Sequence, residues 1–186
     1  MRRLSPAIAA AALTVALVSA PASAGIVDVA VGVYGGANFP MEGGAGAGTV
    51  LGAKLRVLPP IPMIGAEVYY QRVGQNDAED VWNDGDVRVN FSGEGFDVFG
   101  ADLLIGGVRG LPGFKWYGIA GINFVEFSES GSGEYRMGGE LGVGLEIVPP
   151  ALGLSVEGRA LIAYLGVGDE PDPKMATVTV GVNYYF

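Results

Sequence analysis

Apolar residues recur at every second position along much of the chain, which predicts β-strands with one apolar and one polar face. The pattern is longest over residues 134–148. One face of this segment carries Tyr135, Met137, Gly139, Leu141, Val143, Leu145 and Ile147. The other face carries Glu134, Arg136, Gly138, Glu140, Gly142, Gly144 and Glu146. The segment therefore predicts a long strand whose two sides face different environments.

Eight segments with this period are found along the chain. They cover residues 26–39, 49–58, 64–73, 96–108, 114–127, 134–148, 152–165 and 176–186. Short, proline-bearing connections (58–63, 110–114, 148–153) alternate with longer ones (40–48, 74–95, 128–133, 166–174). The 32 glycines disfavour helix. This order predicts an all-β fold, an eight-stranded antiparallel up-and-down β-barrel with both chain ends on the short-turn side.

The longest connection contains a hairpin signal. Residues 79–91 read as two short apolar-patterned runs around the turn Asn83-Asp84-Gly85-Asp86, with Val81, Trp82, Val87, Val89 and Phe91 beside it. Asp-Gly between alternating apolar residues favours a tight turn. We expect this loop, residues 74–95, to extend beyond the barrel, either as a solvated loop tip or as an edge that binds a surface partner.

The fourth strand is ambiguous in its facing. If Asp102 points into the barrel, then Phe99, Leu103 and Ile105 point outward, but Phe96, Val98 and Leu104 point inward. Either a β-bulge or an apolar patch in the lumen would resolve this conflict.

Charged residues of both signs lie on the polar faces of the predicted strands. They are Lys54, Arg56, Glu67, Asp102, Arg136, Glu140, Glu146, Glu157 and Arg159. An eight-stranded barrel leaves a lumen about wide enough for side chains to fill. We interpret these residues as a lumen charge network whose members compensate one another, because an unpaired buried charge is costly. The alternative is a narrow ion path.

Aromatic residues gather at both ends of the predicted strands. Phe39, Tyr70, Phe124, Tyr135 and Tyr164 lie toward the long loops, and Phe114, Trp116, Tyr184 and Phe186 toward the short turns. Aromatic girdles at both interfaces and strands of about 9–11 residues or more are typical of transmembrane barrels. These features favour a barrel with its apolar face in lipid.

Composition excludes several classes of function. The chain has no cysteine and no histidine, and its formal net charge is −9. The commonest general base and a frequent metal ligand are therefore missing, and an acidic chain does not suit phosphate binding. We expect no catalytic, cofactor or metal site and no nucleic-acid partner.

The first 24 residues resemble a secretory signal peptide. Arg2 and Arg3 precede an apolar run, and Ala22-Ser23-Ala24 forms an A-x-A cleavage site. We therefore expect residues 1–24 to be removed on export and residues 25–186 to form the barrel.

Taken together, the export signal, the eight alternating strands and the final strand are similar to the small outer-membrane β-barrel family, of the OmpA barrel-domain and OmpX type. The resemblance implies an outer-membrane location, contact with outer-membrane lipid and a monomeric, non-enzymatic barrel. In that family the closing strand is read by the outer-membrane assembly machinery. The matching residues here are Val178, Val180, Val182, Tyr184 and Phe186. A soluble periplasmic lipocalin-like barrel that binds an apolar ligand is the rival interpretation.

Overall fold

The computed structural model of the protein describes residues 27–41, 47–61, 63–74, 82–84, 87–89, 95–108, 113–127, 134–149, 153–164 and 174–186. The predicted signal peptide, residues 1–24, lies outside these ranges. The strands are β1 (Asp28–Pro40), β2 (Gly48–Leu58), β3 (Ile64–Gly74), β4 (Trp82–Asp84), β5 (Val87–Val89), β6 (Phe96–Gly106), β7 (Gly113–Phe127), β8 (Glu134–Val148), β9 (Leu154–Tyr164) and β10 (Lys174–Tyr185). Among the described residues, no helix is long and apolar enough to cross a membrane.

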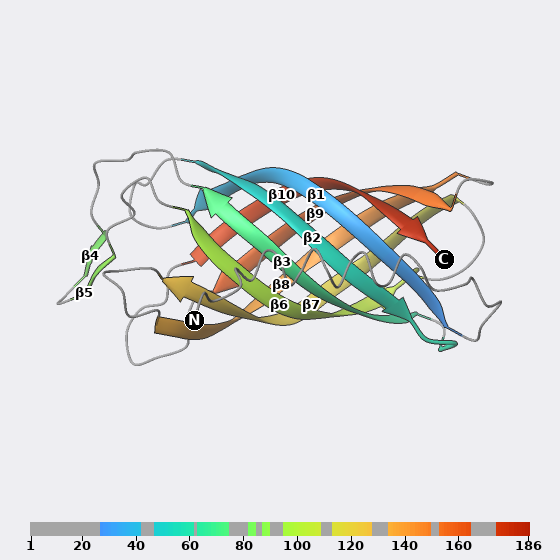
Figure 1. The fold of residues 1–186 in the computed structure, drawn as a ribbon, viewed down its shortest axis with the longest axis horizontal. Coiled ribbons are helices and arrows are strands. Elements are labelled where there is room, and N and C mark those ends of the chain that lie inside the picture. Colours follow the sequence, from blue (N-terminus) through green and yellow to red (C-terminus); the bar gives the residue numbers. More distant parts are fainter. Residues whose placement is uncertain are drawn as a thin grey trace, which may run out of the picture.

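Within the described ranges, eight strands close into an antiparallel barrel in the order β1-β10-β9-β8-β7-β6-β3-β2 (Figure 1). The barrel closes where β1 pairs with β10, from Ala30 opposite Tyr185 to Pro40 opposite Met175. Beyond this pairing, the Phe186 amide donates to the Val29 carbonyl at 2.9 Å. Closure satisfies the backbone groups that the first and last strands would otherwise leave unpaired. The predicted all-β up-and-down barrel is confirmed.

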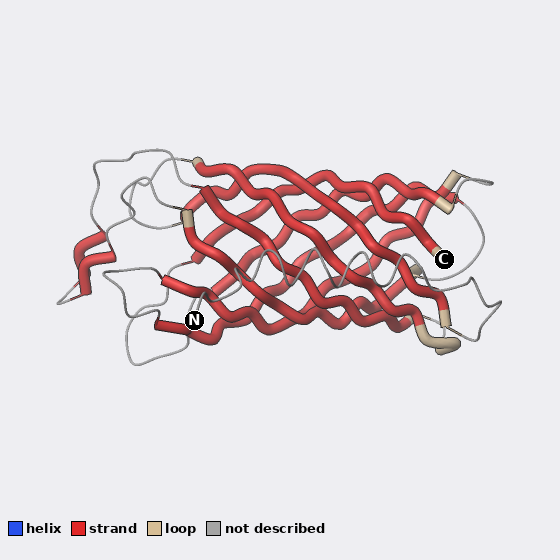
Figure 2. The backbone as a smooth tube through the Cα atoms, in the orientation of Figure 1, coloured by secondary structure: helices blue, strands red, loops and turns tan. Residues whose placement is uncertain are grey.

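The strand limits lie close to those predicted, and the strands run obliquely to the long axis of the barrel (Figure 2). The fourth predicted strand is shorter than expected, because β6 ends at Gly106 rather than Val108. Gly106 has a φ of +137°, a backbone conformation that residues with a Cβ rarely adopt. The strand ends at this residue.

No bulge is needed to explain the facing of β6. The strand pairs in continuous register with β3 and with β7. Phe96, Val98 and Leu104 are buried inside the barrel with Asp102, whereas Leu103 is exposed outside. An apolar patch in the lumen therefore resolves the conflict in the sequence pattern.

The hairpin predicted in the longest connection is present. Strands β4 and β5 form a two-stranded sheet that lies beyond the end of the barrel opposite the C-terminus (Figure 1). Trp82 pairs with Val89 and Asp84 with Val87. Asn83 and Asp84 thus belong to the strand rather than to the turn, since the pairing continues to Asp84 and leaves only residues 85 and 86 between the strands.

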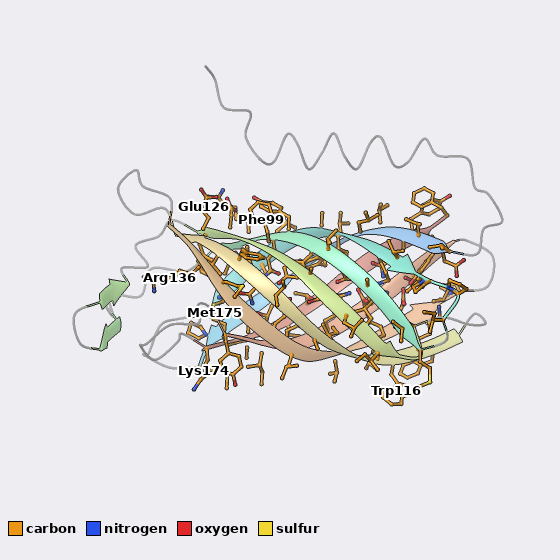
Figure 3. The ribbon with its side chains drawn as sticks, turned by 90° about the horizontal axis from the view of Figure 1, so that it is seen from below. Phe99, Trp116, Glu126, Arg136, Lys174 and Met175 are labelled. Atoms are coloured by element: carbon orange, nitrogen blue, oxygen red, sulfur yellow. The ribbon has the colours of Figure 1, made fainter. Side chains whose placement is uncertain are left out.

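The outer surface of the barrel is apolar. Exposed side chains on it include Val33, Leu51, Val68, Ile122, Leu141, Val143, Leu145, Val156, Ile162 and Val180. Aromatic rings lie at both ends of this surface, as Phe99 and Trp116 show in Figure 3. At one end the Tyr70 and Phe99 ring centroids are 4.9 Å apart. At the other, Tyr184 and Phe186 make an edge-to-face contact at 5.0 Å.

Candidate functional site in the barrel lumen

The interior of the barrel brings together charged residues from four strands. We call the following group the central charge cluster: Lys54 and Arg56 of β2, Glu67 of β3, Glu146 of β8, and Glu157 and Arg159 of β9. Their side chains are almost completely buried. Each lies at an inward position of its strand, because side chains alternate between the two faces of a sheet.

Arg56 is at the centre of this cluster. Its guanidinium donates to Glu67 at 3.0 and 3.1 Å and to Glu146 at 3.1 Å. It also donates to Glu157. A guanidinium has five donors in a fixed fork, so it can serve several carboxylates at once. Arg56 thereby joins strands β2, β3, β8 and β9.

Arg159 and Lys54 extend the same network. Arg159 donates to Glu67, with Nη2 at 2.6 Å, and its Nε lies 3.1 Å from Glu157. Lys54 pairs with Glu157 and lies 3.9 Å from Glu67. All three cations of the cluster therefore contact carboxylates, as the burial of charge requires.

Neutral polar side chains complete the cluster at the turn end. Tyr185 donates to Glu146 at 2.7 Å, and Asn183 donates to Glu146 at 3.1 Å. Ser155 also donates to Glu146. Arg56 donates to the Tyr117 hydroxyl at 3.1 Å. These four residues were not among the predicted lumen sites, although their inward positions in the alternating pattern were a sufficient signal.

The remaining three predicted lumen charges are placed differently. Asp102 and Glu140 are buried beside the cluster, and Asp102 Oδ2 lies 4.0 Å from Arg159 Nη1. Arg136 lies on the inward face of β8 but at its loop end, opposite Val125 and partly exposed (Figure 3). The structure does not bring Arg136 into the central charge cluster, because the strand carries it to the mouth of the barrel.

Two apolar clusters lie on either side of the charges. Toward the loops, the buried group is Tyr34, Val50, Tyr69, Val73, Phe96, Val98, Val125, Ala163 and Met175. Toward the turns, it is Leu58, Leu104, Val108, Tyr117 and Ile119, packed with Leu161 and Tyr185. The same order is seen along the inward face of β2. Val50 lies toward the loops, Lys54 and Arg56 lie in the middle, and Leu58 lies toward the turns. The charged layer is thus enclosed between two apolar layers.

Tyrosine rings in the lumen lie over glycines of neighbouring strands. Tyr34 is paired with Gly52, Tyr69 with Gly100 and Tyr117 with Gly144. A Cβ added at any of these glycines would lie about 2.3–2.4 Å from the tyrosine ring. Glycines on the inner faces of the strands therefore provide the space that large lumen side chains occupy.

The residues of the predicted assembly signal lie on the outer face of β10. Val178, Val180, Val182 and Tyr184 are exposed there, and Phe186 is partly exposed beyond the strand. They form an apolar stripe along the strand that closes the barrel.

Comparison with known proteins places this architecture among solved barrels. No protein-family model matches the chain, and no curated protein matches its sequence. The structure is similar to the N-terminal β-barrel domain of Pseudomonas aeruginosa OprF, with 13% identity and a TM-score of 0.55, over 86% of this chain and 97% of that one.

Two further solved barrels have the same architecture. Neisserial surface protein A has 15% identity and a TM-score of 0.55, over 87% of this chain and 98% of that one. A major outer membrane protein of Thermus thermophilus has 14% identity and a TM-score of 0.56, over 87% of this chain and 100% of that one. The resemblance to small eight-stranded outer-membrane barrels is thus confirmed at the level of the fold.

Proposed function

We propose that this chain is an integral outer-membrane β-barrel protein without enzymatic activity, whose lumen is filled by its own side chains. The observation that carries this proposal is the inverted distribution of polarity. Buried ion pairs occupy the centre, while aliphatic side chains such as Leu51, Val143 and Val180 are exposed on the outside. Apolar patches of this extent on a protein surface mark contact with lipid or with another protein.

Closure of the barrel supports contact with lipid in particular. A strand edge in hydrocarbon would leave backbone groups unsatisfied, so strands span membranes only as closed barrels. The aromatic rings at both ends, among them Trp116 and Phe99, fit the two interfaces of a bilayer. The likeness in fold to solved outer-membrane barrels supports the same location.

The distribution of polarity disfavours the lipocalin-like alternative. A soluble binder of an apolar ligand would need an apolar cavity and a polar outer face. Here Arg56, Glu67 and Glu157 fill the middle of the lumen. The two apolar clusters and the compensated charges equally disfavour a narrow ion path, since an ion would have to pass through both apolar layers.

We also propose that any surface interaction uses the loop of residues 74–95. Strands β4 and β5 extend this loop beyond the barrel (Figure 1). A short two-stranded sheet carries unpaired strand edges, which can accept a partner strand. The structural role of the barrel in the membrane does not depend on this loop. We further propose that the protein is a monomer.

Recognition by the assembly machinery is a separate proposal. The exposed face of β10, formed by Val178, Val180, Val182, Tyr184 and Phe186, has the alternating apolar and aromatic pattern that outer-membrane barrels present at their closing strand. It is accessible from the membrane side of the barrel.

Three experiments test these proposals. Full-length protein expressed in a Gram-negative host should remain with outer membranes after a high-salt wash and require detergent for extraction. Recovery in the soluble periplasmic fraction would contradict the proposal.

In planar bilayers the purified protein should give no steady porin-like conductance, and a reproducible open channel would overturn the filled-lumen account. A variant with residues 75–94 replaced by a short glycine-serine linker should still insert but lose any surface interaction.

A further inference from the structure

The buried part of the lumen contains more acid than base. Among the described residues, the buried carboxyl groups number five and the buried cations three. The carboxyl groups are those of Glu67, Asp102, Glu140, Glu146 and Glu157, and the cations are Lys54, Arg56 and Arg159. Glu67, Glu146 and Glu157 all contact Arg56. Asp102 and Glu140 make up the excess.

Asp102 and Glu140 approach each other across a glycine. In the pairing register, Gly121 of β7 lies between Asp102 of β6 and Glu140 of β8. A Cβ at Gly121 would lie 2.0 Å from Asp102 Oδ1, so the Asp102 carboxyl occupies the place of a side chain at Gly121. The side chains of Asp102 and Glu140 are thus neighbours on either side of Gly121 and interact with each other. The missing side chain at Gly121 therefore allows two acids to meet.

Three of the four carboxyl oxygens of this pair receive no hydrogen bond from the described residues. Both oxygens of Asp102 and Oε1 of Glu140 are buried and accept no hydrogen bond. Arg159 Nη1 lies 4.0 Å from Asp102, beyond hydrogen-bonding distance, while the same guanidinium donates to Glu67. Two ionised carboxylates in contact in this setting would repel each other with little compensation.

The other titratable groups around the pair do not supply a second positive charge. They are Tyr34 of β1 and Glu67 and Tyr69 of β3, with Arg159 of β9 as the cation. The Tyr69 hydroxyl lies next to Glu140 and has no hydrogen-bond partner of normal geometry. A proton between the two carboxyl groups is the smallest addition that gives Asp102 a hydrogen bond.

We propose that Asp102 and Glu140 form a proton-binding site, in which the two carboxyl groups share one proton and carry a single negative charge. One group is then a carboxylic acid that donates to the carboxylate of the other. The proton comes from water when the barrel folds and returns to water when it unfolds. Loss of the proton in the folded barrel would place two facing carboxylates in the middle of the lumen, so the site links the integrity of the lumen to pH.

The linkage has a definite sign. In the unfolded chain both carboxyl groups are ionised above about pH 5. The folded barrel therefore binds one proton more than the unfolded chain, and its stability falls as pH rises until the shared proton is lost. Over that range the folding equilibrium constant decreases by up to about tenfold per pH unit.

The test measures the unfolding of the full chain by urea in lipid vesicles between about pH 6 and about pH 9, below the usual titration of tyrosine and lysine. Wild-type protein should lose stability as pH rises across this range. Asp102→Asn should reduce this dependence, because the amide donates to Glu140 at every pH. Asp97→Asn is the matched control, since it makes the same change on the outer face of the same strand and should leave the dependence unchanged.

Infrared spectroscopy gives a second measurement, which does not depend on reversible unfolding. Wild-type protein at neutral pH should have a carbonyl band of a protonated carboxylic acid, and Asp102→Asn or Glu140→Gln should lack it. A flat pH dependence with no such band in the wild type would overturn the proposal. Stabilisation of the wild type, but not of Asp102→Asn, by Na⁺ or Ca²⁺ at constant ionic strength would overturn it as well, because a cation would then fill the site.

Discussion

The ring of Tyr117 lies directly over Gly144, its partner on the neighbouring strand. Tyr117 is completely buried, and its hydroxyl accepts a hydrogen bond from Arg56 at 3.1 Å. The Arg56 guanidinium also lies 5.2 Å from the centre of the ring. The glycine, the ring and the central charge cluster are therefore one packed unit, in which the ring cannot move without disturbing the charges.

Substitution Gly144→Ala should destabilise the barrel. The added Cβ would lie 2.4 Å from Cε2 and Cζ of Tyr117, and overpacking of this kind costs about 1–3 kcal/mol. Urea unfolding in vesicles measures the loss. The control is Gly118→Ala, on the outer face of the strand that carries Tyr117, where the nearest atom is 3.7 Å from the added Cβ. Equal effects of the two substitutions would contradict the packing described for Tyr117.

Neutralising Glu67 should be more damaging still. Glu67 contacts both Arg56 and Arg159, so Glu67→Gln leaves two buried guanidinium groups with one carboxylate fewer. Breaking a buried ion pair on one side typically costs about 3–5 kcal/mol. The control is Glu126, which is partly exposed at the outer rim of the barrel (Figure 3). Glu126→Gln should cost less than about 1 kcal/mol in the same unfolding measurement. A mild effect at Glu67 would mean that water, rather than Glu67, compensates the arginines.

The cost in folding free energy of an arginine on the outer face should depend on how deep in the membrane it lies. Val143 lies in the middle of β8 and is 60% exposed on the outer face, so Val143→Arg should cost about 2–4 kcal/mol in a bilayer. Thr49→Arg, near the loop end of β2, should cost about 0–1 kcal/mol. Folding free energies in vesicles test this, and equal costs at the two positions would be inconsistent with a membrane around Val143.

Phe186→Ala should separate assembly from stability. The ring contacts Tyr184 at the rim and is only partly buried, so its loss should cost no more than about 1–3 kcal/mol in vitro. If the outer face of β10 is read during assembly, the yield of folded barrel in cells should fall much further. Trp116→Ala, which removes an exposed ring from the same end of the barrel, should leave that yield nearly unchanged. A similar loss of folded yield in both variants would mean that Phe186 contributes only packing at the rim.

Alternation along single strands was sufficient to predict much of the molecule. It assigned Glu146 and Glu157 to the interior and Val143 to the exterior, because the side of a sheet that a residue faces depends only on its position along its own strand. The same rule gave conflicting indications for β6. The conflict arose because Phe96 and Val98 are apolar residues of the lumen, which alternation cannot distinguish from residues of the outer face.

Contacts between strands could not be predicted in this way. The meeting of Asp102 and Glu140 depends on both being level with Gly121, and the packing of Tyr117 on Gly144 depends on the same kind of register. Register is fixed by turn lengths and by packing across several strands at once. Arg136 illustrates the same limit, since its strand position predicted an inward side chain but not that it would lie at the mouth of the barrel.

Two adjacent residues of β10 report on whether the outer face of this barrel lies in lipid. Val180 is exposed on the outer face of β10, whereas its neighbour Thr179 is buried in the lumen. The chain has no cysteine, so Val180→Cys and Thr179→Cys each provide a single site for a spin label. In vesicles the label at Val180 should collide readily with oxygen and poorly with a water-soluble nickel complex, and the label at Thr179 should be protected from both. A label at Val180 that collides freely with the nickel complex would contradict the account.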